Sequence, residues 1–146
     1  MERIEGFASE AEWRRAYREI NDFEKMLVDD GIRVMKIFLH ITPDEQLERL
    51  QDRVTDPLKR WKLSFDDFRN RARWNDYEDA IADMMEETST KRAPWHLIPA
   101  NDKRYARIAA FQVLTRRLSE GVNLSPKPLD NDIQALIDEV TGSKAR

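Results

Sequence analysis

RVMKIFLHITPDE, residues 33–45, is the stretch of the sequence that decides the fold. Its first nine residues are rich in β-branched and aromatic side chains, and their apolar density exceeds strict alternation toward the end, which is typical of a central parallel strand. Thr42 then supplies a helix N-cap, Pro43 suits the first helical position and Glu45 is acidic at the third. The stretch therefore predicts a strand that passes at once into a helix, which runs to about Arg53.

A long helix is predicted before this strand. Ser9 and Glu12 have the spacing of a capping box, and Gly31 ends the apolar pattern that follows them. The apolar residues recur at intervals of three and four, at Trp13, Ala16, Tyr17, Ile20, Phe23 and Leu27. We expect a helix over about residues 10–30 with one buried face.

The sequence after the first strand predicts a helix-rich order with one more strand. Right-handed parallel crossovers are the default when buried strands are joined through helices. The expected elements are a short cationic turn at 56–63, a long helix from Phe65 to about Glu87, a strand at 95–99, a helix capped by Asn101 and running through Leu118, a linker at 121–128 and a weak helix at about 131–140. Because two parallel strands cannot make a stable sheet alone, we expect further strands upstream of this segment and uncovered sheet edges within it.

The amino-acid composition excludes several classes of function for this chain. The chain has 146 residues, a formal net charge of −3, no cysteine and only two histidines, which excludes thiol catalysis and a histidine-based metal cluster. It contains neither a G-x-x-x-x-G-K loop nor a G-x-G-x-x-G loop, so a main phosphate-binding loop has to come from elsewhere. No apolar run approaches a membrane span and the N-terminus is unlike a signal peptide, so we expect a cytoplasmic protein without membrane contact.

Two stretches of the sequence are strongly basic, although the net charge of the whole chain is only −3. Residues 49–73 carry 8 basic and 4 acidic side chains, and residues 103–117 carry 5 basic and none acidic. These two stretches could converge on one anionic ligand. The overall acidity, with a pI of about 5.5, makes nucleic-acid binding an unfavourable interpretation.

Arg49 and Arg53 are four residues apart on one helical face, where like charges repel unless an anion or acidic neighbours compensate them. They are candidate phosphate ligands, and the alternative is that Glu45, Glu48 and Asp52 neutralise them on a solvated face. Lys59, Arg60 and Lys62 surround Trp61 in a segment suited to a cationic lid. The alternative there is a solvated basic loop that Trp61 anchors in the core.

Lys103, Arg104 and Arg107 open the helix after the second strand, at the carboxyl edge of the sheet where open α/β folds bind ligands. Surface solvation is the alternative for these three cations. We interpret His40 as a satisfied core histidine. Asp66 and Asp67 have the positions of first-turn capping acids and not of metal ligands.

Four ordered motifs in residues 2–118 resemble the polyphosphate kinase 2 family. They are EWRRAYREINDFE at 12–24, KIFLHI at 36–41 with Glu45, Gln46 and Arg49, DPLKRWKLS at 56–64, and APW at 93–95 with PANDK at 99–103. The resemblance implies a P-loop kinase fold with three layers, in which polyphosphate and a nucleoside mono- or diphosphate exchange a phosphoryl group in either direction with Mg²⁺. It further implies a lid at about 54–64 with Arg49, Arg53, Lys59, Arg60 and Lys62 on polyphosphate, and Asn101, Lys103 and Arg104 on the nucleotide side.

The chain departs from the family pattern at its beginning. The Walker A loop and the Asp-Arg-Ser-Trp-Tyr motif of the family are expected upstream of ERIEGF at 2–7, so the catalytic set is incomplete and no metal ligand is identified. We expect the C-terminal half of such a kinase over 2–118, inactive alone, with a linker and tail at 119–146. It is an isolated segment, a truncated gene product or one piece of a split enzyme. The alternative is a noncatalytic anion-binding or self-associating module of the same fold, and a homo-oligomer is expected because the sheet is incomplete.

Overall fold

The centre of the molecule is a pair of parallel strands, and the computed structural model describes residues 2–142 around it. Strand β1 spans Lys36–His40 and β2 spans Trp95–Pro99, with Phe38 opposite Leu97 in the register. The backbone N–H of Ala100 donates to the carbonyl of His40 at 2.6 Å and extends the ladder past the strand ends. Both predicted strands are confirmed as parallel, although each is only five residues long.

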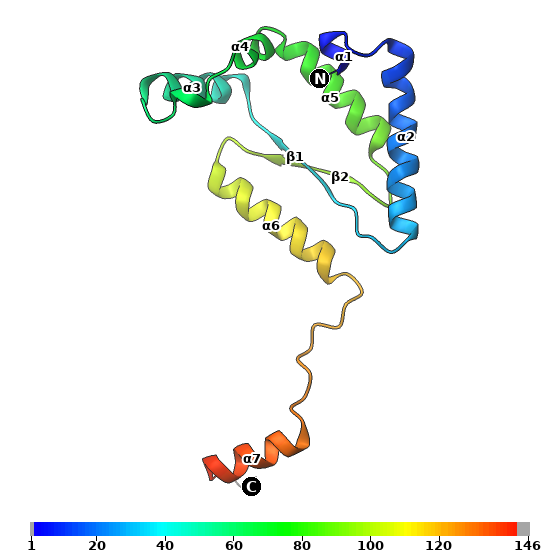
Figure 1. Cartoon of the computed structure of the whole chain (residues 1–146), viewed down its shortest axis with the longest axis vertical. Helices are drawn as coiled ribbons and strands as arrows, with labels where there is room; N and C mark the ends of the chain where they lie inside the picture. Colours follow the sequence, from blue (N-terminus) through cyan, green and yellow to red (C-terminus); the bar gives the residue numbers. More distant parts are fainter. Residues whose placement is uncertain (1, 143–146) are drawn as a thin grey trace.

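Helices cover the two faces of this pair (Figure 1). On one side lie α1 (Glu2–Glu5), α2 (Glu10–Asp29) and α5 (Trp74–Thr88), and on the other lies α6 (Lys103–Ser119). Ile98 of β2 packs with Ala100 and Ala106 in the small core under α6. The molecule is therefore a helix-rich, three-layer α/β fold.

The predicted capping signals are confirmed at two helices. The backbone N–H of Ser9 donates to the carboxylate of Glu12 at 2.8 Å at the start of α2. The hydroxyl of Thr42 accepts from the backbone N–H of Glu45 at 3.3 Å at the start of α3, which spans Pro43–Thr55. Gly31 has a φ of +86°, the left-handed conformation that glycine adopts without cost after a helix.

The predicted long helix from Phe65 to Glu87 is wrong as a single element. It is divided into α4 (Phe65–Ala72) and α5, and Arg73 lies between them with φ −113° and ψ 28°. The break lets residues from both helices reach the carboxylate of Glu5, which is 3.2 Å from Arg69 and accepts from the hydroxyl of Tyr77 at 3.1 Å. A buried carboxylate requires such partners, and its position was not visible in the periodicity of residues 65–87.

The predicted N-cap of α6 is off by one residue. The carboxylate of Asp102, not the amide of Asn101, accepts from the backbone N–H groups of Arg104 and Tyr105 at 2.7 and 3.2 Å. The side chain of Asn101 is engaged with Thr42 across the strand ends instead. An adjacent Asn-Asp pair offers two capping groups, and the contact with the other strand determines which one caps.

The sheet is only partly covered, as two strands alone require. Leu39 of β1 is 53% exposed, and Leu97 of β2 is also exposed. The interpretation of His40 as a core histidine is wrong, because its side chain is 43% exposed and lies 3.7 Å from Glu78. The strand pair has too little apolar cover to bury its ends.

The remaining elements lie at the periphery. A short 3-10 helix, η1 (Arg60–Lys62), follows α3, and α7 (Asn131–Thr141) lies at the end of an extended segment, away from the rest of the chain (Figure 1). The predicted terminal helix is confirmed within one residue. Among residues 2–142, no helix combines the length and apolar character that crossing a bilayer requires.

Candidate functional site

The loops after β1 and β2 are tied together at the carboxyl edge of the sheet. The backbone N–H of Thr42 donates to the side-chain oxygen of Asn101 at 3.0 Å, and the Asn101 amide donates to the Thr42 hydroxyl at 3.2 Å. These two bonds join residues that are 59 positions apart in the sequence. They hold the N-termini of α3 and α6 side by side, where ligands bind in open α/β folds.

Arg49 of α3 is fixed against this edge. Its Nε donates to the carboxylate of Glu45 at 2.7 Å, and its Nη2 donates to the carbonyl of Ala100 at 2.7 Å. Of the described residues, none accepts a hydrogen bond from Nη1. A guanidinium carries five N–H donors in a rigid fork, so this arrangement orients Arg49 and leaves donors for a further anion.

A pocket of 320 Å³ brings Arg49 together with two cations of α6. Lys103 and Arg107 line it, and none of the lining residues is acidic. The other lining residues are apolar, namely Leu39, Ile41, Ala100, Ala106 and Ala110. Within residues 2–142, neither Lys103 nor Arg107 makes a side-chain ion pair, so this pocket has the charge that an anion requires.

The structure places the other nucleotide-side candidates differently. Asn101 links the strand ends, as described above, and does not line this pocket. Arg104 is adjacent in sequence but also does not line it, and its backbone N–H donates to the carboxylate of Asp102. Arg107, one helical turn after Lys103, is the residue that joins the group, and the i, i+4 spacing from Lys103 was the signal for it.

The predicted lid residues form a cationic loop between α3 and α4. Lys59 lies 2.9 Å from the carboxylate of Asp56, and the Nε of Arg60 donates to the carbonyl of Val54 at 2.9 Å. The hydrogen bond from Lys59 lowers the pKa of Asp56 and raises that of Lys59, so both groups are charged at neutral pH. The Nζ of Lys62 lies 5.2 Å from the ring centroid of Trp61.

Trp61 does not anchor this loop in the core. Its side chain is 78% exposed, and the neighbouring Leu58 and Phe65 are exposed as well. Large apolar groups that are exposed together are typical of a surface that contacts a partner or a ligand. The interpretation of Trp61 as a core anchor is therefore wrong.

Arg53 lies near the end of α3, next to the cationic loop, and not in the pocket. Its Nη1 donates to the carboxylate of Asp67 at 3.3 Å, and the same carboxylate accepts from the backbone N–H of Ser64 at 2.9 Å. Asp67 is a capping acid, as predicted, and it connects Arg53 to the start of α4. The structure thus separates Arg49 from Arg53, although the two lie on one helix.

Several other cations of the basic stretch 49–73 serve the fold. Arg69 and Arg73 lie 3.2 and 4.0 Å from Glu5, and Arg71 donates to the carbonyl of Pro43 at 2.8 Å and to Gln46 at 3.1 Å. A count of charges along the sequence does not reveal these partners, because they lie in other helices and loops. The net charge of the stretch consequently overstates how many cations are available for a ligand.

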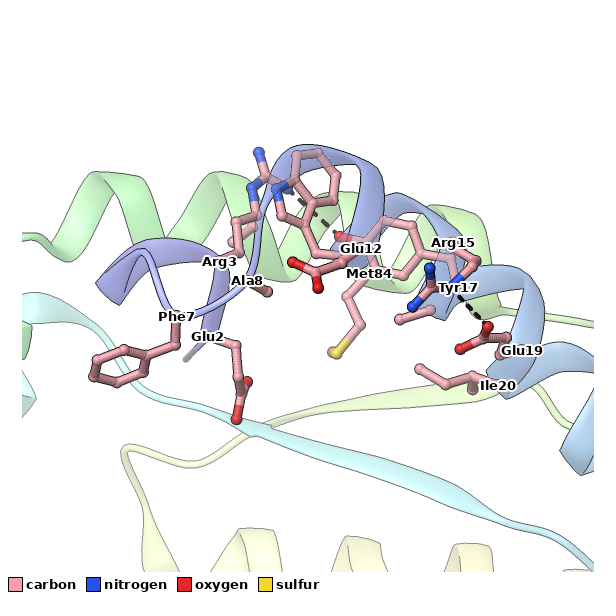
Figure 2. A pocket seen from close by; sticks show the side chains of 13 residues that line it. Glu2, Arg3, Phe7, Ala8, Glu12, Arg15, Tyr17, Glu19, Ile20 and Met84 are labelled. Carbon is pink, nitrogen blue, oxygen red and sulfur yellow. Dashed lines mark hydrogen bonds and ion pairs between the residues drawn. The ribbon is translucent and has the colours of Figure 1, made fainter.

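A larger hollow of 490 Å³ lies between α1, α2 and α5, and Figure 2 shows its lining. Arg3 lies in it with its guanidinium 4.2 Å from the ring centroid of Trp13 and 2.6 Å from the carboxylate of Asp83. Sequence reasoning missed this hollow, since it depends on the placement of α1. Arg3 is already paired there, so the hollow lacks the free positive charge of the pocket at the strand ends.

No metal site is built by the described residues. Residues 2–142 contain no group of three or more His, Asp or Glu side chains placed to hold an ion. The Mg²⁺ implied by the resemblance therefore does not fit a site among these residues, and no chemical step below depends on it.

The fold and the pocket together define a P-loop-kinase-like α/β domain with its cations at the carboxyl edge of the sheet. The polyphosphate kinase 2 family model matches residues 1–123. The chain belongs to the polyphosphate kinase 2 family.

Individual relatives agree with this assignment. The chain is 50% identical over 120 residues to a polyphosphate:AMP phosphotransferase of Pseudomonas syringae pv. tomato, and this match covers 82% of the chain and 24% of the relative. It is 40% identical over 127 residues to an AMP/ADP-polyphosphate phosphotransferase of Meiothermus ruber, with 86% and 47% covered. The crystal structure of polyphosphate kinase 2 from Arthrobacter aurescens TC1 superposes with a TM-score of 0.82 at 42% identity, over 98% of this chain and 50% of the other. The chain thus spans from about a quarter to half the length of these relatives.

Proposed function

We propose that this chain forms part of a polyphosphate-dependent nucleotide phosphotransferase, which transfers a phosphoryl group between polyphosphate and a nucleoside mono- or diphosphate in either direction. The single observation that carries the proposal is the convergence of Arg49, Lys103 and Arg107 on one pocket without a carboxylate. Family membership and the names of the relatives support the choice of substrate class.

Phosphoryl transfer depends on positioning and on charge neutralisation more than on covalent chemistry. In this proposal, Arg49 binds phosphate oxygens through its free Nη1, and Glu45 and Ala100 fix its orientation in advance. Lys103, which also lines the pocket, adds a point charge from α6. A guanidinium held in place before the ligand arrives loses little side-chain entropy when the ligand binds.

The lid at about residues 54–64 covers the phosphate chain in the closed enzyme. Lys59, Arg60 and Lys62 supply the charge, and each has one local partner that an approaching phosphate could replace. Arg53 acts at the hinge through Asp67, and Asn101 and Arg104 complete the nucleotide side. In this proposal the functional unit of the cytoplasmic enzyme is residues 2–118, and 119–146 are a linker and tail, of which residues 143–146 lie outside the part of the chain that the structure describes.

Binding of a short-chain polyphosphate, measured by calorimetry at low and moderate salt, tests the proposal. Arg49→Ala with Lys103→Ala should weaken binding about tenfold or more, which corresponds to about 1.4 kcal/mol. The matched control, Arg18→Ala with Lys127→Ala, removes the same charge from exposed positions on α2 and the linker and should change affinity less than about twofold. Equal losses in the two double variants would show that binding is unspecific attraction and would overturn the proposal.

A turnover assay separates an enzyme part from a noncatalytic anion-binding module of the same fold. The 146-residue polypeptide contains no glycine-rich phosphate loop, so with polyphosphate, Mg²⁺ and ADP or GDP we expect less than about 0.1 turnover per second. Addition of a family segment that carries the phosphate loop should restore turnover if the chain is an enzyme part. Binding without any restored turnover would instead favour the noncatalytic alternative.

A further inference from the structure

Helix α6 carries its basic side chains at its two ends. Lys103, Arg104 and Arg107 lie in its first turns, and Arg116 and Arg117 lie in its last turn. The residues between Arg107 and Arg116 are all uncharged, and the helix rises about 14 Å between these two arginines. The basic stretch 103–117 is therefore two separate groups of cations, and the proposed function uses only the first.

The second group of cations lines a pocket of 230 Å³ at the other edge of the sheet. Val34 and Pro94 also line it and lie just before β1 and β2, so the pocket is at the amino edge of the strand pair. Figure 1 shows α6 running back along the strands, which brings its C-terminal end to this edge. The other lining residues are Lys91, His96, Val113, Arg116, Arg117 and Glu120.

Arg117 is held in a fixed orientation at this pocket. Its Nη1 donates to the carboxylate of Glu120 at 2.6 Å, and its Nη2 donates to the carbonyl of Arg92 at 3.0 Å. Glu120 is the acidic residue of the lining, and this contact neutralises it. The charges of the remaining cations in the pocket are therefore not compensated by its lining.

Lys91, Arg116 and His96 are the groups that are open to a ligand. Within residues 2–142, no carboxylate pairs with Lys91 or Arg116, and the ring of His96 has no hydrogen-bond partner. Lys91 and Arg116 are exposed, so they can bind an anion without giving up a partner in the chain. The pocket thus keeps a net positive charge.

The C-terminal end of a helix would by itself repel an anion, because its last carbonyl groups carry a partial negative charge. Here Arg33 covers these groups, since its Nη1 donates to the carbonyls of Arg117 and Leu118 at 2.7 and 2.8 Å. The helix dipole accounts for arginines in the last turn of α6. It does not account for Lys91, which a different segment brings to the same pocket.

We propose that this pocket is a second phosphate site, which binds a short inorganic oligophosphate such as tripolyphosphate. Several cations around one cavity favour an anion with several charges over a single carboxylate. The volume of 230 Å³ is below the range of about 300–1,000 Å³ that is usual for drug-sized ligands. Among residues 2–142, no Phe, Tyr or Trp lines this pocket to stack a nucleobase. The inference goes beyond the proposed function, because it uses no residue of the first pocket.

NMR spectra of the full 146-residue chain test the site, because the chain has only two histidines, His40 and His96. The variant Lys103→Ala/Arg107→Ala is used, since it removes two cations of the first pocket. Titration with tripolyphosphate should shift the imidazole signals of His96 and leave those of His40 nearly unchanged. His96→Gln assigns the signals. No shift at His96, or equal shifts at both histidines, would overturn the proposal.

Calorimetry in the same background measures the contribution of the cations. The further changes Lys91→Ala and Arg116→Ala should weaken the binding of tripolyphosphate at least about tenfold, because both cations are open to the ligand. The matched control makes the further changes Arg18→Ala and Lys127→Ala at exposed positions and should weaken binding less than about twofold. Far-UV circular dichroism verifies that the variants are folded. Equal losses in the two sets of variants would show unspecific attraction and refute the site.

ATP distinguishes an inorganic ligand from a nucleotide, because it carries three phosphate groups together with a base and a ribose. In the same background it should bind no more tightly than tripolyphosphate, and tighter binding of ATP would contradict the proposal.

The two phosphate sites can be tested independently in the parent chain, where calorimetry should resolve two classes of site. Lys91→Ala with Arg116→Ala should remove one class, and Arg49→Ala with Lys103→Ala should weaken the other. Loss of both classes from Lys91→Ala with Arg116→Ala would overturn the second site. Failure of the second site is thereby distinguished from failure of the proposed function.

Discussion

The Nη2 of Arg49 donates to the carbonyl of Ala100 across 2.7 Å, and this bond ties the helix after the first strand to the end of the second. The same guanidinium is held by Glu45 from one turn earlier on its own helix. The proposed phosphate ligand is thus also a structural link between the two strand ends.

Arg49→Lys should lower the free energy of unfolding by about 1–2 kcal/mol, since a lysine keeps the charge but cannot bond Glu45 and Ala100 in the same fork geometry. Urea denaturation measures the loss. Arg18→Lys, at an exposed position on α2, is the matched control and should stay within about 0.5 kcal/mol of the parent. Similar free energies of unfolding for Arg49→Lys and Arg18→Lys would mean that the hydrogen bond to Ala100 does not stabilise the fold.

Asp102→Ala should destabilise the chain by about 1 kcal/mol, because Asp102 caps two backbone N–H groups at the start of α6. Asp102→Asn retains an acceptor at that position and should recover most of the loss. Thermal or urea unfolding monitors both variants. Asp22→Ala, at an exposed position inside α2, should not destabilise the chain, and a loss there equal to that of Asp102→Ala would argue against the cap.

Lys36→Met should cost about 3–5 kcal/mol, since it leaves the carboxylate of Glu24 buried without its cation. The side chains of Lys36 and Glu24 are 10% and 11% exposed, and the Nζ of Lys36 lies 2.6 Å from the Oε2 of Glu24. The double variant Lys36→Met/Glu24→Leu should be more stable than Lys36→Met alone, because it removes the unpaired charge. A double-mutant cycle in urea measures this coupling, and additive losses would contradict it.

Tyr77 should make stability fall at alkaline pH. Burial, followed by the hydrogen bond to Glu5, raises the pKa of Tyr77 above its usual value near 10. The folded chain therefore holds the phenol proton more tightly than the unfolded chain does. This contribution is complete below pH about 10 and is lost as the pH rises through the folded pKa.

Tyr77→Phe should remove that part of the pH dependence, and urea unfolding of parent and variant at pH 8 and above 10 measures the difference. At pH 8 the variant should lose about 1 kcal/mol, because the single hydroxyl proton of Tyr77 is then no longer donated to the carboxylate of Glu5 or, alternatively, to the side-chain oxygen of Asn70. If the difference in unfolding free energy between the parent and Tyr77→Phe does not narrow with rising pH, Tyr77 is not the titrating group.

Trp61→Ala tests the lid without disturbing the core. Because the side chain is largely exposed, the free energy of unfolding should change by less than about 0.5 kcal/mol. Polyphosphate affinity should fall about two- to fivefold if Trp61 positions Lys62 through its cation–π contact. Calorimetry measures the affinity, and a stability loss without any change in binding would assign Trp61 to the fold.

The sequence by itself determined the elements whose signals are local. The strand at Lys36–His40, the capped helix that starts at Pro43 and the helix that ends before Gly31 were all predicted close to their observed bounds. Apolar periodicity, N-caps and glycine C-caps depend on residues within a few positions of one another, so they can be read without knowledge of the fold. The family motifs, too, are contiguous strings.

Only the tertiary structure decided how the charged side chains are used. Arg49 and Arg53 look alike in sequence, yet one contacts Ala100 at the pocket and the other contacts Asp67 at the start of α4. Arg69 pairs with Glu5 and is therefore not available to a ligand, and this pairing lies beside the break between α4 and α5 at Arg73. The partner of a long charged side chain depends on distances of a few ångströms between elements far apart in the chain, and the strength of that pairing depends on burial. Neither the distances between these elements nor the burial of the side chains is defined before the chain has folded.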